Sequence, residues 1–174
     1  MAQILVNSRM CAEGHRPICQ DTGIVTVFLE IGMDVQWESE LSVEEMINEG
    51  VRRAYKHPDN VLRPSILLDP AGARKNSGDN TPAVIHTRVV AGDKVEVHLA
   101  AKGGGSENKA KMAMLNPSDS ILDWVVETMP KLGAGWCPPG ILGIGIGGTA
   151  EKSAVLAKEA LLDSIDIQDL QKRG

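Results

Sequence analysis

Aromatic residues, long hydrophobic runs and positive charge are all scarce in this chain of 174 residues. The aromatic side chains are three Trp, one Tyr and one Phe, and the formal net charge is −5, so the chain lacks the stacking and basic surfaces that bind nucleic acids. No stretch approaches the roughly 18 uninterrupted apolar residues of a membrane span, and the first residues lack the order of a signal peptide. We therefore expect a cytoplasmic protein with no nucleic-acid or membrane partner.

Cysteine is also rare. The chain has three cysteines, an odd number with no C-x-x-C pair, so we expect no disulfide framework and a reducing compartment. Hydrophobic residues make up 43% and charged residues 24%, which together with the length is typical of one soluble domain. Glycine is in excess at 18 residues, with clusters at 103–105 and 133–148.

The spacing of apolar residues predicts an α/β fold with a mixed sheet and flanking helices. An apolar, β-branched run at 24–31 is typical of a buried strand. Alternating segments at 83–90 and 94–100 flank a three-residue loop and predict an antiparallel hairpin over about 83–100. The core face of this hairpin would consist of Ile85, Val89, Val95, Val97 and Leu99.

Helices are expected in three places. A capping-box pattern at Ser42 precedes helical apolar spacing over 43–55. A second helix should begin at 116–118 and end before Pro130, and a third should run from about 149 to 164. The side chains expected to be buried by the last two helices are Ile121, Leu122, Val125, Val126, Ala154, Val155, Leu161 and Leu162.

Two histidines and a glycine pattern could bind ligands. His86 and His98 face each other in the predicted hairpin and could chelate a metal, but charged residues share their face, which indicates a solvated sheet surface. Gly143, Gly145 and Gly148 satisfy G-x-G-x-x-G, although the second half of a dinucleotide-binding unit does not follow.

The segment K-G-G-G-S-E-N-K (102–109) is a stronger candidate for anion binding. Consecutive glycines allow backbone N–H groups to converge on a carboxylate or phosphate, and Lys102 and Lys109 would add positive charge. A tight structural turn is the alternative interpretation.

Two of the three cysteines lie in loops. Cys19 and Cys137 are surrounded by polar, glycine or proline residues rather than by an apolar pattern. Thiolates presented on loops are soft donors that suit iron–sulfur clusters. Cys11 is interpreted as a small buried hydrophobe.

Four motifs occur in order along the chain. They are I-C-Q-D-T-G (18–23), N-V-L-R-P-S (60–65), K-G-G-G-S-E-N-K (102–109) and C-P-P-G-I-L-G-I-G-I-G-G-T (137–149). Together they resemble the N-terminal part of the iron–sulfur-dependent class I fumarate hydratases and their tartrate dehydratase relatives. The resemblance implies a hydro-lyase of the tricarboxylic acid cycle that reversibly hydrates fumarate to malate, with a 4Fe–4S cluster as Lewis acid.

The resemblance also implies roles for individual residues. Cys19 and Cys137 would be two of three cluster ligands, and Asp21 would transfer a proton beside the cluster. The residues that would bind the dicarboxylate substrate are Gln20, Asp21, Arg63, Gly104 and Gly105. An arginine fork and a backbone nest are chemically suited to a dianion.

The third cluster ligand departs from the family pattern. It should lie well downstream of Cys137, where no cysteine follows, and Cys11 does not match a ligand position. We therefore expect 1–174 to be a single N-terminal domain of a truncated hydro-lyase that is inactive alone, needs a C-terminal domain or beta subunit, and forms a homodimer when complete. Dehydration of tartrate or another hydroxy-diacid, a non-catalytic anion- or nucleotide-binding module, and a docking subunit remain alternatives.

Overall fold

The computed structural model describes residues 2–17, 22–137 and 140–173. The chain divides into two compact units, Met1–Gly140 and Ile141–Gly174. The first unit carries all the described strands, and the second is helical, so the expected α/β class is confirmed. None of the described helices is long and apolar enough to cross a membrane.

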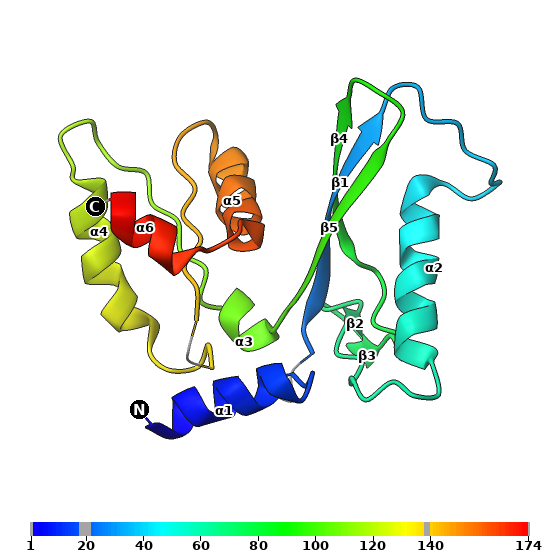
Figure 1. The fold of residues 1–174 in the computed structure, drawn as a ribbon, viewed down its shortest axis with the longest axis horizontal. Helices are drawn as coiled ribbons and strands as arrows, with labels where there is room; N and C mark the ends of the chain where they lie inside the picture. Colours follow the sequence, from blue (N-terminus) through cyan, green and yellow to red (C-terminus); the bar gives the residue numbers. More distant parts are fainter. Residues whose placement is uncertain (1, 18–21, 138–139, 174) are drawn as a thin grey trace. The chain divides into compact units, whose positions relative to one another are not determined.

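Three strands of the first unit form a mixed sheet in the order β4–β1–β5 (Figure 1). The central strand β1 (Ile24–Gly32) is parallel to β4 (Val84–Val90) and antiparallel to β5 (Val95–Lys102). The predicted strands and the mixed sheet are thus confirmed. The predicted pairing of 83–90 with 94–100 is wrong, because β1 lies between the two strands that the short turn connects.

β1 takes the central position because it is apolar on both faces. Val27 is completely buried on one face and Phe28 is only 7% exposed on the other, and strands with two buried faces belong inside a sheet. Three amides at the end of β1 donate to carbonyls of the β4–β5 turn: Gly32 to Lys94, Met33 to Val90 and Asp34 to Gly92. A Cβ at Gly32 would overlap the carbonyl of Gly92, so this close approach requires glycine.

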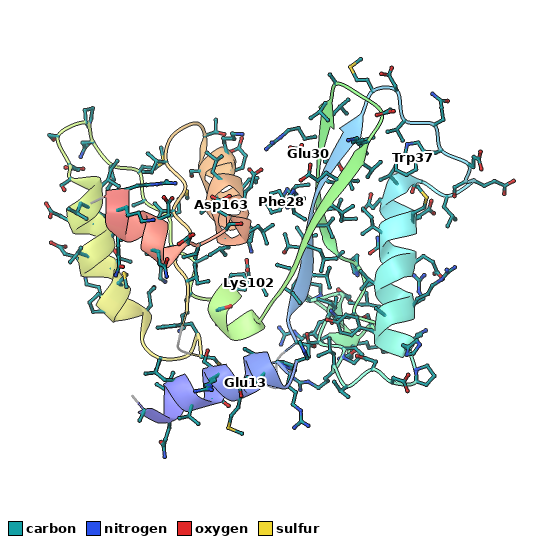
Figure 2. All side chains as sticks on the ribbon, viewed as in Figure 1. Glu13, Phe28, Glu30, Trp37, Lys102 and Asp163 are labelled. Atoms are coloured by element: carbon teal, nitrogen blue, oxygen red, sulfur yellow. The ribbon has the colours of Figure 1, made fainter. Side chains whose placement is uncertain are left out.

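The insertion of β1 separates the two histidines of the predicted hairpin. His86 and His98 both pair with Phe28, one from each side, and side chains two strands apart lie about 10 Å from each other. The ring of His86 stacks on Phe28, which is labelled in Figure 2, with centroids 4.9 Å apart. His98 Nε2 lies 2.8 Å from Glu96 Oε1. The cross-strand metal site that the hairpin suggested is therefore not formed by this pair.

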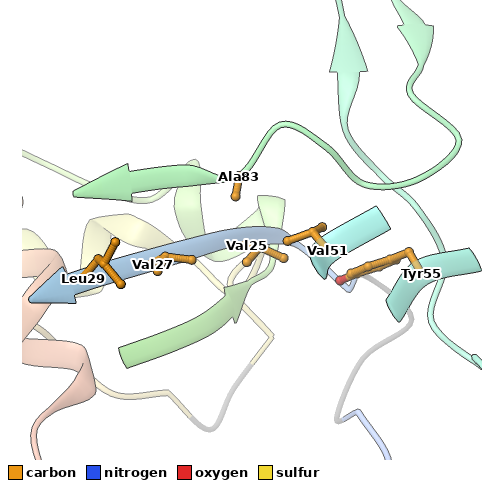
Figure 3. Close-up of a cluster of buried hydrophobic side chains, with 6 residues drawn as sticks. All are labelled: Val25, Val27, Leu29, Val51, Tyr55 and Ala83. Atoms are coloured by element: carbon orange, nitrogen blue, oxygen red, sulfur yellow. The ribbon is translucent and has the colours of Figure 1, made fainter. Parts of the chain in front are cut away.

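Helix α2 (Val43–Lys56) covers one face of the sheet and begins as predicted. The Glu45 amide donates to Ser42 Oγ at 3.2 Å, and the Ser42 amide donates to the Glu45 carboxylate at 2.9 Å, which completes the capping box. Figure 3 shows the buried cluster between this helix and the sheet, which consists of Val25, Val27, Leu29, Val51, Tyr55 and Ala83.

Only one of the five residues of the predicted core face is covered, so this prediction is wrong for the other four. Ile85 packs against the buried cluster, whereas the remaining members are exposed: Val89 by 66%, Val95 by 40%, Val97 by 54% and Leu99 by 57%. The members of the cluster come from α2, β1 and Ala83, the residue before β4, so the apolar stripe of β5 lies outside it.

The remaining elements are short. In the first unit they are α1 (Ala2–Glu13), β2 (Leu67–Leu68), β3 (Lys75–Asn76), α3 (Gly104–Glu107), α4 (Ile121–Thr128) and η1 (Met129–Leu132). β2 and β3 form a separate antiparallel pair. In the second unit they are α5 (Ala150–Glu159), η2 (Ala160–Leu162) and α6 (Ile167–Arg173).

The two later helices differ from the predictions in detail. The Asn116 amide donates to Asp119 Oδ2 at 2.7 Å, which forms a turn, so α4 starts only after its cap Ser120 rather than at 116–118. It ends before Pro130, as predicted, and α5 begins after Thr149, close to the predicted start, but ends at Glu159. Neither helix has a buried residue. The predicted burial of their apolar faces is therefore wrong for the described residues.

Candidate functional site

The structure describes some of the predicted site residues. Arg63, Gly104, Gly105 and Cys137 lie in the described ranges, and Cys19, Gln20 and Asp21 lie outside them. The first motif therefore enters the described structure at Thr22. The arrangement around that point shows which motifs the fold brings together.

Hydrogen bonds join the end of the first motif to the second motif. Thr22 is 7% exposed, and its hydroxyl donates to the backbone carbonyl of Arg63. Ser65 Oγ donates to the carbonyl of Gly23 at 3.2 Å. The two residues that follow Asp21 are thus attached to the segment that carries Arg63, whose side chain is exposed.

Asn80 completes this connection from a third segment. Its side chain is fully buried, Nδ2 donates to the Gly23 carbonyl at 3.1 Å, and Oδ1 accepts from the Ser65 amide at 2.8 Å. The backbone of Asn80 has φ +62°, a left-handed conformation that Asn tolerates better than most residues. We call residues 22–23, residues 63–65 and Asn80 the loop joint.

The role of the segment that contains Asn80 is not apparent from the sequence. Residues 75–82 read K-N-S-G-D-N-T-P, a composition that predicts an exposed turn. In the structure Asp79 is only 8% exposed, and Asn76 Nδ2 donates to the carbonyl of Pro64 at 2.9 Å. The density of Asn and Asp was the available signal, but composition does not distinguish a buried amide from a solvated one.

Asp79 attaches the same segment to α2. Its Oδ1 accepts from the amide and hydroxyl of Thr81 at 3.0 and 2.6 Å, and its Oδ2 accepts from Arg52 Nε at 3.1 Å. Burial alone would raise the pKa of the Asp79 carboxyl, but the bonds from Thr81 and Arg52 outweigh burial and lower the pKa. The carboxylate therefore remains charged and holds the segment beside α2.

The glycine-rich third motif approaches the loop joint through Gly23. Gly23 has φ +76°, and a Cβ there would overlap backbone atoms of Lys102 and Gly103. The start of β1 therefore lies against the backbone that leads directly into α3, where Gly104 and Gly105 begin the helical turn. A side chain at position 23 would push these two segments apart.

The third motif in turn approaches the loop of Cys137. A Cβ at Gly105 would lie 2.5 Å from the carbonyl oxygen of Gly135, two residues before Cys137. Cys137 is exposed and has φ +59°. Its amide donates to the carbonyl of Ala134 at 3.3 Å. Contacts within the first unit thus link parts of the first three motifs to the loop that precedes the fourth.

The positive charge of the glycine motif is partly offset. Lys102, labelled in Figure 2 between β5 and α3, places Nζ 3.0 Å from Glu107 Oε2. Ser106 Oγ donates to the carbonyl of Gly103 at 3.0 Å, which stabilises the turn. The contribution of Lys102 to anion binding is therefore smaller than its formal charge predicts.

Cys137 has the chemistry of a cluster ligand, because an exposed loop thiolate is a soft donor for iron. The other described cysteine is engaged locally: Cys11 Sγ donates to the carbonyl of Pro17 at 3.4 Å, and the residue is half-buried on α1. Among the described residues, no three His, Cys, Asp or Glu side chains converge on a metal position. The exposed loop position of Cys137 leaves its sulfur accessible, and the described residues contain no complete set of metal ligands.

A groove of about 390 Å³ lies against α2, and its lining contains no residue of the four motifs. Its lining residues are Leu41, Glu45, Asn48, Glu49, Arg52, Thr81 and Pro82. Hydrogen bonds from Arg53 and Arg52 lower the pKa of Glu49, and those from Ser42 lower the pKa of Glu45. The carboxylates of Glu45 and Glu49 in this groove therefore already accept hydrogen bonds that stabilise α2.

The G-x-G-x-x-G pattern has a packing explanation. The described residues 141–146 form no strand, whereas a dinucleotide fingerprint needs one before its glycines. A Cβ at Gly143 would overlap the backbone of Ala157 in α5, and a Cβ at Gly145 would overlap the backbone of Ser153 in the same helix. These glycines allow the segment to lie close against its own helix.

Comparison with known proteins adds independent information. Residues 1–173 match the family model described as fumarate hydratase (Fumerase). A protein of Methanocaldococcus jannaschii, provisionally named L(+)-tartrate dehydratase subunit alpha, is 38% identical over 93% of this chain and 58% of its own length. L(+)-tartrate dehydratase subunit alpha of Escherichia coli strain UTI89 is 29% identical over 91% of the chain and 53% of its own length.

A relative with another name matches over a smaller share of its length. The anaerobic class I fumarate hydratase of Escherichia coli K12 is 35% identical over 87% of this chain and 28% of its own length. The chain thus spans between about a quarter and three fifths of the length of these relatives.

Proposed function

Since the chain belongs to the fumarate hydratase family, we propose that it is the N-terminal portion of a hydro-lyase that acts on a small hydroxy-diacid. Reversible hydration of fumarate to malate is the reaction that we propose. Dehydration of L(+)-tartrate is the second candidate, and the names of two relatives that match over most of this chain favour it.

The observation that carries the proposal is the contact between the motifs. The loop joint connects the turn after Asp21 to the segment of Arg63, and Gly23 and Gly105 lie against the neighbouring loops. Parts of the first three motifs and the loop before the fourth come from positions as far apart as 22 and 135, yet their backbones meet in the first unit. This is the arrangement that a shared substrate site requires.

We assign the binding of the two substrate carboxylates to separate groups. The exposed guanidinium of Arg63 can donate two parallel hydrogen bonds to one carboxylate. Backbone N–H groups of Gly104 and Gly105 would donate to the other, with Gln20 as a further contact. Such directional bonds fix the orientation of a dianion before any bond changes.

Proton transfer is assigned to Asp21. During dehydration its carboxylate oxygen would accept the proton that leaves the substrate carbon, and it would return that proton during hydration. Thr22, the next residue, is held by its bond to the carbonyl of Arg63. The acid–base group and the carboxylate clamp would therefore be kept in register.

We further propose that Cys19 and Cys137 supply two of the three thiolates of a 4Fe–4S cluster. When bound, such a cluster supplies a Lewis-acidic iron that polarises a substrate hydroxyl group. The remaining thiolate would come from a C-terminal domain or a beta subunit, in a homodimeric cytoplasmic enzyme. The share of the relatives' length that this chain does not match supports such a further portion.

The test is turnover by the reconstituted protein. The chain would be expressed alone and with its C-terminal portion or beta subunit, loaded anaerobically with iron and sulfide, and assayed with fumarate and with L(+)-tartrate. We expect turnover of one diacid by the assembly and none by the chain alone. An assembly that holds a cluster and hydrates or dehydrates neither diacid would contradict the proposal, and dicarboxylate binding without turnover would favour the non-catalytic anion-binding module.

A further inference from the structure

We propose that Asn80 is a positioning residue of this hydro-lyase, which keeps the turn after Asp21 in register with the loop of Arg63. The inference rests on the proposed function, because it matters for catalysis only if Asp21 and Arg63 act on one substrate. Asn80 itself would not touch the substrate, since its side chain is fully buried.

The bonds of Asn80 reach two distant segments at once. Nδ2 donates to the carbonyl of Gly23, 57 positions away, and Oδ1 accepts from the amide of Ser65, 15 positions away. Gly23 follows Asp21 by two positions, and Ser65 follows Arg63 by two positions. One amide group thus joins the backbone at Gly23 to the backbone at Ser65.

A positioning role for Asn80 and a purely stabilising role predict different kinetics. Groups that act on one substrate must be placed within a fraction of an ångström, and a misplacement of about 1 Å can lower the rate about 100-fold. A buried asparagine that only stabilised the fold would change the free energy of unfolding and leave the kinetics of the folded enzyme unchanged. The two roles therefore predict different results for the same substitution.

Two substitutions at this position separate the side chain from the backbone. Asn80→Gly removes every hydrogen bond of the side chain, including the long one from Ser65 Oγ, and tolerates the φ of +62° without strain. Asn80→Asp keeps an acceptor for the Ser65 amide but places a carboxylate oxygen against the carbonyl of Gly23. If the glycine variant does not fold, the aspartate variant still tests the bond to Gly23.

Asn48→Ala is the matched control. Asn48 Oδ1 accepts from the amide of Ala83 at 2.9 Å and attaches α2 to the segment before β4. This is also a part-buried bond between distant segments, with a separation of 35 positions, but it touches no member of the loop joint. Its loss should lower stability without moving Arg63.

Amide hydrogen exchange of the chain tests the geometry without requiring activity. In Asn80→Gly the protection factor of the Ser65 amide should fall at least tenfold, while that of the Ala83 amide should stay unchanged. The reverse should hold in Asn48→Ala. Unchanged protection of Ser65 in Asn80→Gly would overturn the inference whatever the enzyme does.

Kinetics of the reconstituted assembly test the positioning role. We expect kcat/KM for the turned-over diacid to fall at least tenfold in Asn80→Gly and Asn80→Asp, and to stay within twofold of the wild type in Asn48→Ala, at a temperature where all are folded. Wild-type kinetics in the folded Asn80 variants would overturn the inference. An inactive wild-type assembly would instead refute the proposed function, while hydrogen exchange would still report on the joint.

Discussion

Replacement of Gly23 by alanine tests the close approach between β1 and the glycine motif. Gly23 has φ +76°, and a left-handed conformation destabilises an alanine by about 1–2 kcal/mol. The new Cβ would also overlap backbone atoms of Lys102 and Gly103, which no side-chain rotation can relieve. Forcing extra volume into a packed site costs about 1–3 kcal/mol more. We therefore expect Gly23→Ala to lower the free energy of unfolding by roughly 2–5 kcal/mol in total.

Gly78 supplies a matched control within the same chain. Its φ is also +76°, but a Cβ there would meet no heavy atom within 4 Å. Gly78→Ala should therefore lower the free energy of unfolding only by the cost of the left-handed conformation, about 1–2 kcal/mol. Urea unfolding followed by circular dichroism would give the midpoint and slope for both variants and the wild type. The difference between the variants measures the steric contact alone.

Equal destabilisation of the two variants would refute this reasoning. It would mean that the backbone of Lys102 and Gly103 does not lie against Gly23. Gly23→Ala should also weaken function more than stability predicts, because it displaces the loop joint from Gly104. In the reconstituted assembly we expect kcat/KM to fall in Gly23→Ala and to remain unchanged in Gly78→Ala.

Three further substitutions address stability. Gly50 lies inside α2, and no heavy atom lies within 4 Å of the position that a Cβ would take. Gly50→Ala should therefore raise the free energy of unfolding by about 0.5–1 kcal/mol, measured by urea unfolding. A lower free energy of unfolding in this variant would contradict the absence of a steric contact. The lowered pKa of Asp79 contributes stability above the pKa of an unfolded carboxyl, and this contribution disappears as pH falls through the folded value. Asp79→Asn should therefore lower stability at pH 7 and flatten its decline below about pH 4, and an unchanged acid profile would argue against the charged bond to Arg52. The buried Tyr55 hydroxyl has no hydrogen-bond partner within the described structure, so Tyr55→Phe should leave the free energy of unfolding unchanged or raise it by up to about 1 kcal/mol; a clear loss would reveal a partner.

Local patterns were sufficient to predict individual elements. The apolar run at 24–31 became β1, and the capping box at Ser42 and the helical spacing after it became α2. Both depend on neighbours within a few residues, where propensity and capping dominate. The motif residues assigned to the substrate and the cluster stay a prediction.

Contacts between distant segments could not be predicted in the same way. The alternation in 83–100 is compatible with a hairpin, but β1 lies between β4 and β5 and pairs with both of them. β1 is apolar on both faces, which favours the central position of a sheet. The burial of Asn80 depends on carbonyl and amide groups 57 and 15 positions away. A one-dimensional pattern contains no record of such partners.

The arginine of the second motif offers the most direct test of the proposed function. In the reconstituted assembly, steady-state kinetics with fumarate and L(+)-tartrate would be measured for the wild type, Arg63→Gln and the control Arg53→Gln, an exposed arginine on α2 that pairs with Glu49. We predict that Arg63→Gln lowers kcat/KM at least 100-fold, consistent with the loss of a bidentate, charge-assisted carboxylate contact, whereas Arg53→Gln stays within twofold of the wild type. Full activity of Arg63→Gln would contradict the assignment of the substrate site to these loops.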